Sequence, residues 1–173
     1  MVSKSGLLHG RDEYDWKWWH ETVPSKLSNL HQKGYQVVIL SNQGRLTLNG
    51  EELAEAKPFK AKMESVMRAL GIPVTVMIAG DNDLCRKPRT GMWSLLGGPL
   101  GNTKIERSQS FMVGDAAGRE KDFSDNDRHF GMNLQIGFFT PEEFFRGEPA
   151  KDLGHKFDPA WYSLEGEGNK GIA

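Results

Sequence analysis

Short runs of β-branched and aromatic residues alternate with segments of helical periodicity, and this alternation constrains the fold more than any other feature of the chain. The strand-like runs are QVVIL at 36–40, VTVMIA at 74–79, SFMV at 110–113 and IGFF at 136–139. Strands separated by helices favour a parallel sheet that is covered on both faces. We therefore predict an α/β fold of the doubly wound class, with buried strands.

The helices between these strands are predicted from apolar spacing and from capping residues. Apolar side chains recur at helical spacing through 59–70, and Gly71 is placed to end that helix. Ser124, with Asp127 three residues later, resembles the N-cap of another helix. The segment Thr-Pro-Glu-Glu at 140–143 predicts the start of the last helix, because it combines a capping residue, a first-turn proline and two acids near the helix dipole.

Composition narrows the class of protein. The 173 residues suit one domain, and no run of eighteen apolar residues is available to span a membrane. The lone cysteine, Cys85, cannot form an internal disulfide, which favours a reducing compartment. A net charge of −1 lacks the basic footprint of proteins that coat nucleic acid, but a protein acting on a strand end needs only a local basic cleft.

Polar groups suited to holding a phosphate follow three of the predicted strands. Ser41 comes after the first, with Asn42 and Gln43 behind it; Lys87 lies in the loop after the second, and Asp115 follows the third. Ligands of doubly wound sheets bind beyond the carboxyl ends of the strands. A hydroxyl can donate to phosphate oxygens, a lysine can neutralise their charge and a carboxylate can hold Mg²⁺. These side chains therefore form the candidate site, although each alone could serve an ordinary turn.

In this order and context, Ser, Lys and Asp match the second, third and fourth motifs of the haloacid dehalogenase superfamily. From about Lys4 to Pro159, the sequence resembles the phosphatase domain of polynucleotide kinase 3′-phosphatases, particularly fungal forms. The strings that carry the resemblance are DWKWWHETVPSKL, GYQVVILSNQG, RKPRTGMW, FMVGDAAGR, DFSDNDRHF and TPEEFF. The resemblance implies a Rossmann-like three-layer α/β/α sandwich and a Mg²⁺ cofactor. It also implies a substrate with a DNA 3′-phosphate end and a role in nuclear DNA repair, where repair-protein partners are conceivable.

The resemblance also assigns roles to particular residues. Ser41 is expected to bind the phosphoryl oxygens, with Asn42 and Gln43 shaping the loop beside it. Lys87 is expected to stabilise the charge of the phosphoryl group. Asp115 is expected to act as the magnesium ligand of the fourth motif.

Four further residues are expected around this centre. Asp122 and Asp127 are expected to support the ligand residues. Arg86 and Arg119 are candidates for contacts to DNA phosphates, with surface salt bridges as the alternative.

The first motif of the superfamily, a strand ending in Asp-x-Asp, has no counterpart in this sequence. The family places it about ten residues before the Lys-Ser-Gly that stands here at 4–6, which falls before Met1. Its first aspartate attacks phosphorus and its second acts as general acid and base. The Asp-x-Asp pairs at 81–83 and 125–127 lack the right context, and turn or cap roles suit them better. A truncated sequence, an inactive relative and a strand supplied from elsewhere remain as explanations, of which truncation is favoured. We expect an empty strand position in the sheet.

We expect a phosphatase domain over 1–159 and a disordered tail over 160–173. No Gly-x-x-x-x-Gly-Lys-Ser/Thr segment is present, so a kinase activity is not predicted from this chain. A module that binds DNA ends or partners without catalysis is the alternative from another class, and a small-metabolite phosphatase is the third.

Overall fold

The computed structural model describes residues 1–6, 12–44, 46–48, 50–102 and 104–153. The predicted tail at 160–173 lies outside these residues. The elements are α1 (Thr22–Gln32), β1 (Val37–Asn42), β2 (Thr47–Leu48), β3 (Glu51–Glu52), α2 (Ala56–Leu70), β4 (Val74–Ala79), α3 (Gly91–Leu95), η1 (Arg107–Gln109), β5 (Phe111–Val113), α4 (Asn126–Leu134), β6 (Gly137–Phe139) and η2 (Glu142–Arg146). No helix among these is long and apolar enough to cross a bilayer.

The predicted parallel strands form two hydrogen-bonded pairs. β1 runs parallel to β4 with Val37 opposite Val74, and β5 runs parallel to β6 with Phe111 opposite Gly137. β2 and β3 form a small antiparallel hairpin. Within the described ranges, no ladder joins the β1–β4 pair to the β5–β6 pair. The parallel α/β class predicted from the sequence is confirmed.

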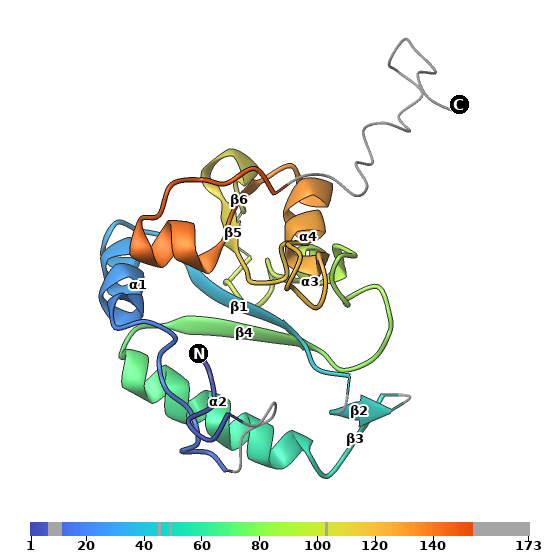
Figure 1. The fold of residues 1–173 in the computed structure, drawn as a ribbon. Coiled ribbons are helices and arrows are strands. Elements are labelled where there is room, and N and C mark those ends of the chain that lie inside the picture. Colours follow the sequence, from blue (N-terminus) through green and yellow to red (C-terminus); the bar gives the residue numbers. More distant parts are fainter. Residues whose placement is uncertain (7–11, 45, 49, 103, 154–173) are drawn as a thin grey trace.

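Helices cover these strands on more than one side. Figure 1 shows α2 along one side of the β1–β4 pair, with α3 and α4 on the other. The apolar stripe of α2 is buried at Met63, Val66 and Leu70, and the helix ends where predicted, with Gly71 in the left-handed conformation. Phe130 of α4 is 1% exposed and anchors that helix in the core beside β5 and β6.

The last helical segment begins as the sequence predicts. The Glu143 carboxylate accepts a hydrogen bond from the Thr140 amide at 2.7 Å, and the Thr140 hydroxyl accepts one from the Glu143 amide at 3.3 Å. This reciprocal pair is a capping box, which satisfies two amides that the helix itself leaves unpaired. The segment η2 that follows is π-helical and packs against α1, because Lys26 donates to the carbonyl of Phe144.

Two local expectations were wrong. The strands are less buried than their apolar runs predicted: β1 and β5 are half-buried throughout, β4 is half-buried except at Ala79, and β6 is exposed at Gly137 and Phe139, because the strands form only two-stranded pairs among the described residues. Ser124 does not cap α4: Asp125 precedes the helix, and the Ser124 hydroxyl has no hydrogen-bond partner in the described part of the chain. Asp127 is drawn away from the predicted cap into an ion pair with Lys87, which is described below.

Candidate active site

Lys87 lies at the carboxyl end of β1, although it comes from the loop after β4. The Asn42 side chain clamps its backbone, because Nδ2 donates to the Lys87 carbonyl at 3.0 Å and Oδ1 accepts from the Lys87 amide at 2.9 Å. Its ammonium donates to the Leu40 carbonyl at 2.7 Å. Residues 45 positions apart in sequence are thereby held together, and the cation sits next to the strand that carries Ser41.

Asp127 pairs with this lysine in the interior. Its Oδ1 lies 2.7 Å from the Lys87 ammonium, and each side chain is only 9% exposed. Its Oδ2 accepts a hydrogen bond from the Ala116 amide at 3.2 Å, which ties the pair to the residue after Asp115. A Cβ atom on Gly114 would lie 2.4 Å from Asp127 Oδ2, so a glycine is required there. The loops after β1, β4 and β5 therefore meet at this ion pair.

Ser41 is half-buried near the end of β1 and its hydroxyl oxygen accepts a hydrogen bond from Gln43 Nε2 at 2.9 Å. The backbone amide of Gln43 donates to the Ala79 carbonyl at the end of β4, at 2.8 Å. The expected phosphate loop is therefore anchored to both strands of the pair. The Ser41 hydroxyl hydrogen remains available to donate to a ligand, because the contact with Gln43 uses only the oxygen as an acceptor.

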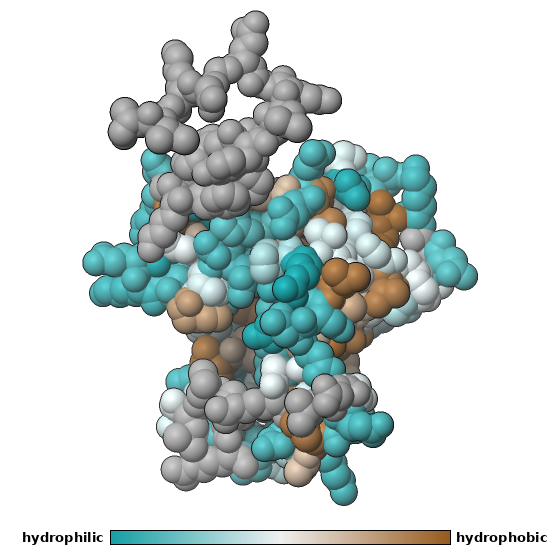
Figure 2. All heavy atoms as spheres, turned by 90° about the vertical axis from the view of Figure 1, so that its right-hand side faces the viewer, coloured by the Kyte–Doolittle hydropathy of each residue, from teal (hydrophilic) through white to brown (hydrophobic). Residues whose placement is uncertain are grey.

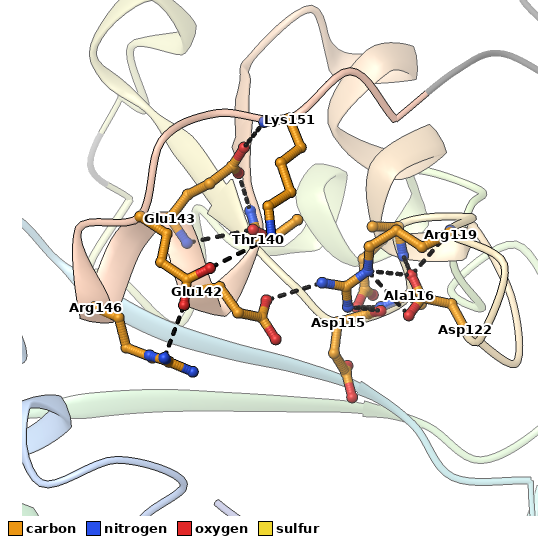
Figure 3. Close-up of polar contacts among 12 residues, drawn as sticks. Asp115, Ala116, Arg119, Asp122, Thr140, Glu142, Glu143, Arg146 and Lys151 are labelled. Carbon is orange, nitrogen blue, oxygen red and sulfur yellow. Dashed lines mark hydrogen bonds and ion pairs between the residues drawn. The ribbon is translucent and has the colours of Figure 1, made fainter.

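Asp115 is exposed directly after β5. In Figure 3 its carboxylate points away from the polar cluster around Arg119. Burial lowers the pKa of the Met1 amino group, and the charge of Asp115 opposes this shift. No group of three His, Cys, Asp or Glu side chains capable of holding a metal occurs in the described ranges. Asp115 alone does not fit an octahedral Mg²⁺ site, which needs several anchored oxygens.

Arg119 is held by acidic partners rather than projecting into solvent. Its Nε lies 2.9 Å from an oxygen of Asp122 and its NH1 lies 2.9 Å from Glu142. Its NH2 donates to the backbone carbonyl of Asp115 at 3.3 Å (Figure 3). The hydrogen bonds with Asp122 raise the pKa of Arg119 far above its usual range. The guanidinium is therefore a permanent cation between the carboxylates of Asp122 and Glu142.

The carboxylates of Asp122 and Glu142, which pair with Arg119, are ionised at neutral pH. Partial burial alone would raise the pKa of Asp122, but hydrogen bonds from the Arg119 side chain and from the amides of Arg119 and Ala117 outweigh it and lower the pKa. Burial likewise opposes ionisation of Glu142, yet hydrogen bonding by its own amide and by Arg119 lowers its pKa. Both carboxylates thus carry charge when they face Arg119.

Arg86 differs from Arg119 in its surroundings. Its guanidinium lies against Gly44 in the loop after β1, where a Cβ atom would be 3.3 Å from NH1. No ion pair of Arg86 is found within the part of the chain that the structure describes. Of the two arginines expected at a DNA phosphate, Arg86 is therefore the one whose charge is not already matched by a carboxylate.

The surface around the site is mixed. Figure 2 shows a largely hydrophilic face on which hydrophobic patches are scattered. One hollow of about 400 Å³ borders the Lys87 loop and is lined by Leu84, Arg89, Thr90, Gly91, Ser94 and Asn133. Another, of about 250 Å³, lies between α1 and η2. Ser41, Lys87 and Asp115 line neither hollow.

The structure brings some of the residues singled out in the sequence into contact, whereas no hydrogen bond or ion pair joins Asp115 to Ser41 or Lys87 among the described residues. Lys87 and Asp127 are in contact, Asn42 clamps Lys87, and Ala116 links the pair to Asp115. Glu142 was expected only to favour the helix dipole, and its contact with Arg119 was missed. No sequence pattern signals that contact, because 23 positions separate the two residues.

The parallel strands, their covering helices and the polar residues at the strand ends define a Rossmann-like α/β domain. The solved structure of D,D-heptose 1,7-bisphosphate phosphatase from B. bronchiseptica, complexed with magnesium and phosphate, matches with a TM-score of 0.52 and 16% identity over 82% of this chain and 78% of that one. More narrowly, the chain belongs to the polynucleotide kinase 3 phosphatase family, whose sequence profile matches residues 1–145.

Several relatives share this family character. A bifunctional polynucleotide phosphatase/kinase of Schizosaccharomyces pombe is 38% identical over 159 residues, which cover 92% of this chain and 36% of that protein. A polynucleotide 3′-phosphatase of Arabidopsis thaliana is 35% identical over 75% of this chain and 20% of that protein. A 20.8 kDa protein of Autographa californica nuclear polyhedrosis virus is 40% identical over 70% of this chain and 67% of that protein. This chain therefore spans about a third of the S. pombe relative and a fifth of the Arabidopsis one.

Proposed function

We propose that this domain is a polynucleotide 3′-phosphatase that removes a terminal phosphate from DNA ends during strand-break repair in the nucleus. The observation that carries the proposal is the placement of the Lys87 cation at the end of β1, fixed by Asn42 and by Asp127. This geometry sets a positive charge beside the Ser41 loop, where a phosphoryl group would bind at the carboxyl ends of the strands. The name of the S. pombe relative supports a polynucleotide as the substrate, and the name of the Arabidopsis relative supports its 3′-end.

Lys87 has capacity left for a ligand. An ammonium group has three N–H donors, and two of them are directed to the Leu40 carbonyl and to Asp127. The third is available for a phosphoryl oxygen, and the Ser41 hydroxyl can supply another donor beside it. Because Lys87 is fixed before the ligand arrives, little reorganisation is needed when charge develops on the phosphoryl group.

The attacking carboxylate must come from outside the residues that form this site. The edge of β1 that does not face β4 has no strand partner among the described residues, and β1 is half-buried along its whole length. We propose that a strand ending in Asp-x-Asp lies between β1 and β5 in the active protein.

The proposed Asp-x-Asp strand would also affect Mg²⁺ binding. Mg²⁺ would add positive charge at the phosphoryl group, and Asp115 would be one of its ligands. Asp115 alone does not make the site, so we propose that Mg²⁺ binds well only when carboxylates of the added strand are present.

The experiment compares the 173-residue chain with a version carrying an N-terminal extension that ends in Phe-Asp-x-Asp-Gly-Thr. Phosphate release is measured with a 3′-phosphorylated oligonucleotide and with free sugar phosphates. We expect turnover of the oligonucleotide only in the extended protein. In that protein Lys87→Ala should lower kcat about 10²- to 10³-fold. Lys104→Ala is the control, because Lys104 pairs with Glu106 at the exposed surface.

The outcomes separate the candidate functions. Preference for sugar phosphates would favour the small-metabolite phosphatase and overturn the polynucleotide assignment. Binding of DNA ends without turnover in the extended protein would favour the non-catalytic module, which is motivated by the lack of an Asp-x-Asp strand in this chain. Turnover in the 173-residue chain alone would show that the nucleophile has been assigned wrongly.

A further inference from the structure

We propose that Arg119 is a positioning residue, which couples the Asp115 loop to the start of η2 through Glu142, and that it does not bind the substrate phosphate. The proposal deepens the proposed function and rests on it for the meaning of Asp115. It replaces the expectation that Arg119 contacts DNA.

Arg119 and Asp122 hold the loop after β5 together with the contacts that Ala116 makes to α4. The Asp122 carboxylate accepts hydrogen bonds from the amides of Ala117 and Arg119, both at 3.1 Å. Arg119 closes the loop from the other side, because its NH2 donates to the Asp115 carbonyl. The backbone on either side of Ala116 is therefore fixed, and the direction of the Asp115 side chain follows from it.

Glu142 anchors this loop to a rigid support. It binds Arg119 NH1 at 2.9 Å from the first position of η2. The start of η2 is itself locked by the capping box of Thr140 and Glu143, and the Lys151 amide donates to the other oxygen of Glu143 (Figure 3). A displacement of the Glu142 backbone would therefore strain this cap, so the side chain that reaches Arg119 extends from a fixed backbone.

Charge and exposure argue against a phosphate contact by Arg119. Its side chain is 30% exposed, and each of its three nitrogens already donates to an acceptor, which leaves two of its five N–H groups; charge therefore decides more than donor count. Two carboxylates face one guanidinium, so the cluster is net negative before Asp115 is counted. A phosphate would meet repulsion there, whereas no carboxylate pairs with Arg86 among the described residues.

The test uses two matched glutamates of the same segment. Glu142 and Glu148 have side chains 29% and 27% exposed and each pairs with an arginine, but only Glu142 reaches the Asp115 loop. Amide hydrogen exchange of the peptide covering 114–122 is measured in the 173-residue chain. Glu142→Gln should speed exchange there about tenfold, the effect of losing one charge-assisted hydrogen bond. Glu148→Gln should leave it unchanged. Equal exchange in both variants would overturn the proposal.

DNA binding distinguishes positioning from direct contact. Anisotropy of a fluorescent 3′-phosphorylated oligonucleotide is measured with Glu142→Gln, Arg119→Gln and Arg119→Lys. If Arg119 bound the phosphate, Glu142→Gln would free it and tighten binding, Arg119→Gln would weaken binding, and lysine would restore part of it. Positioning predicts that Glu142→Gln does not tighten binding. It also predicts that Arg119→Lys speeds loop exchange as Arg119→Gln does, because lysine cannot bridge three acceptors.

Turnover in the strand-extended protein completes the test. Glu142→Gln should lower kcat with little change in KM, whereas a lost substrate contact would raise KM. If neither wild type nor variants act on 3′-phosphorylated DNA, the proposed function fails. The exchange measurement still decides whether Arg119 and Glu142 hold the loop.

Discussion

Asn42 and Lys87 exchange two hydrogen bonds, in which the side-chain amide of one residue pairs with the backbone of the other in the manner of a strand ladder. The Asn42 side chain therefore fixes the position of the Lys87 backbone. The Lys87 side chain extends from this fixed backbone, and its ammonium binds the Leu40 carbonyl and Asp127.

Asn42→Ala should destabilise the fold and displace Lys87. Each lost hydrogen bond contributes about 1 kcal/mol, so the free energy of unfolding should fall by about 2 kcal/mol. Urea unfolding measures the change. Gln43→Ala, which removes only the contact with the Ser41 hydroxyl, should cost less than half as much. Equal losses of unfolding free energy in the two variants would mean that the Asn42–Lys87 hydrogen bonds stabilise the fold no more than the Gln43–Ser41 contact does.

Asp127→Ala should leave a buried cation without its partner. Breaking a buried ion pair on one side costs about 3–5 kcal/mol, because the remaining charge stays desolvated. Both side chains are 9% exposed, so water offers little compensation. Glu106→Ala removes the exposed partner of Lys104 and should change stability by less than about 0.5 kcal/mol. A small effect of Asp127→Ala in chemical unfolding would contradict a buried ion pair.

Gly114→Ala should disrupt the same ion pair by crowding. The new methyl carbon would lie 2.4 Å from Asp127 Oδ2 and 2.5 Å from Asp127 Cβ, so the carboxylate has to move. Overpacking of this kind costs about 1–3 kcal/mol, to which displacement of the ion pair adds. At Gly98 the nearest neighbour of an added methyl would be 3.8 Å away, so Gly98→Ala should be nearly neutral. Thermal unfolding of both variants tests the difference.

The capping box should make stability depend on pH through Glu143. Partial burial would raise the pKa of Glu143, but hydrogen bonds from Thr140 and from the Lys151 amide outweigh it and lower the pKa below 4.5. A carboxylate with a lowered folded pKa stabilises the fold above its unfolded pKa, and this contribution is lost as pH falls through the folded value.

Glu143→Gln should therefore lower the free energy of unfolding at pH 7 by about 0.5–1.5 kcal/mol, because the carboxylate accepts hydrogen bonds on both oxygens and glutamine offers only one. The gap between variant and wild type should close as the pH falls well below 4.5, because the wild-type carboxyl is then neutral as well. The exposed Glu64 on α2 serves as control, and Glu64→Gln should shift stability little at either pH. A gap that persists in acid would show that shape rather than charge matters at position 143.

Magnesium should bind the 173-residue chain weakly. Asp115 is a single exposed carboxylate, whereas Mg²⁺ loses its water reluctantly and needs several anchored oxygens. Titration calorimetry should show no tight one-to-one binding, and Asp115→Asn should change the heats little. Tight stoichiometric binding would reveal ligands that the described residues do not bring together.

Much of the fold could be predicted because its causes are local in sequence. The apolar stripe of α2 and the left-handed Gly71 act within a few residues, and so does the capping box of Thr140 and Glu143. Parallel strands end on the same edge of a sheet, so the sequence also indicated that Ser41, Lys87 and Asp115 would follow strand ends. In the structure Ser41 is still part of β1, as its penultimate residue. Their roles in catalysis stay predictions.

Tertiary structure decided which side chains pair. The local pattern favoured Ser124 and Asp127 as a cap, but Asp127 instead faces Lys87, because a buried ammonium without a carboxylate costs far more than an unmade cap. Likewise Arg119 faces Glu142 only because β6 returns beside β5 and brings the start of η2 to the Asp115 loop. Sequence determined the elements and the order of the strand ends through short-range spacing. The partners of Lys87 and Arg119 were decided by chain closure and burial, which bring distant residues together independently of their spacing.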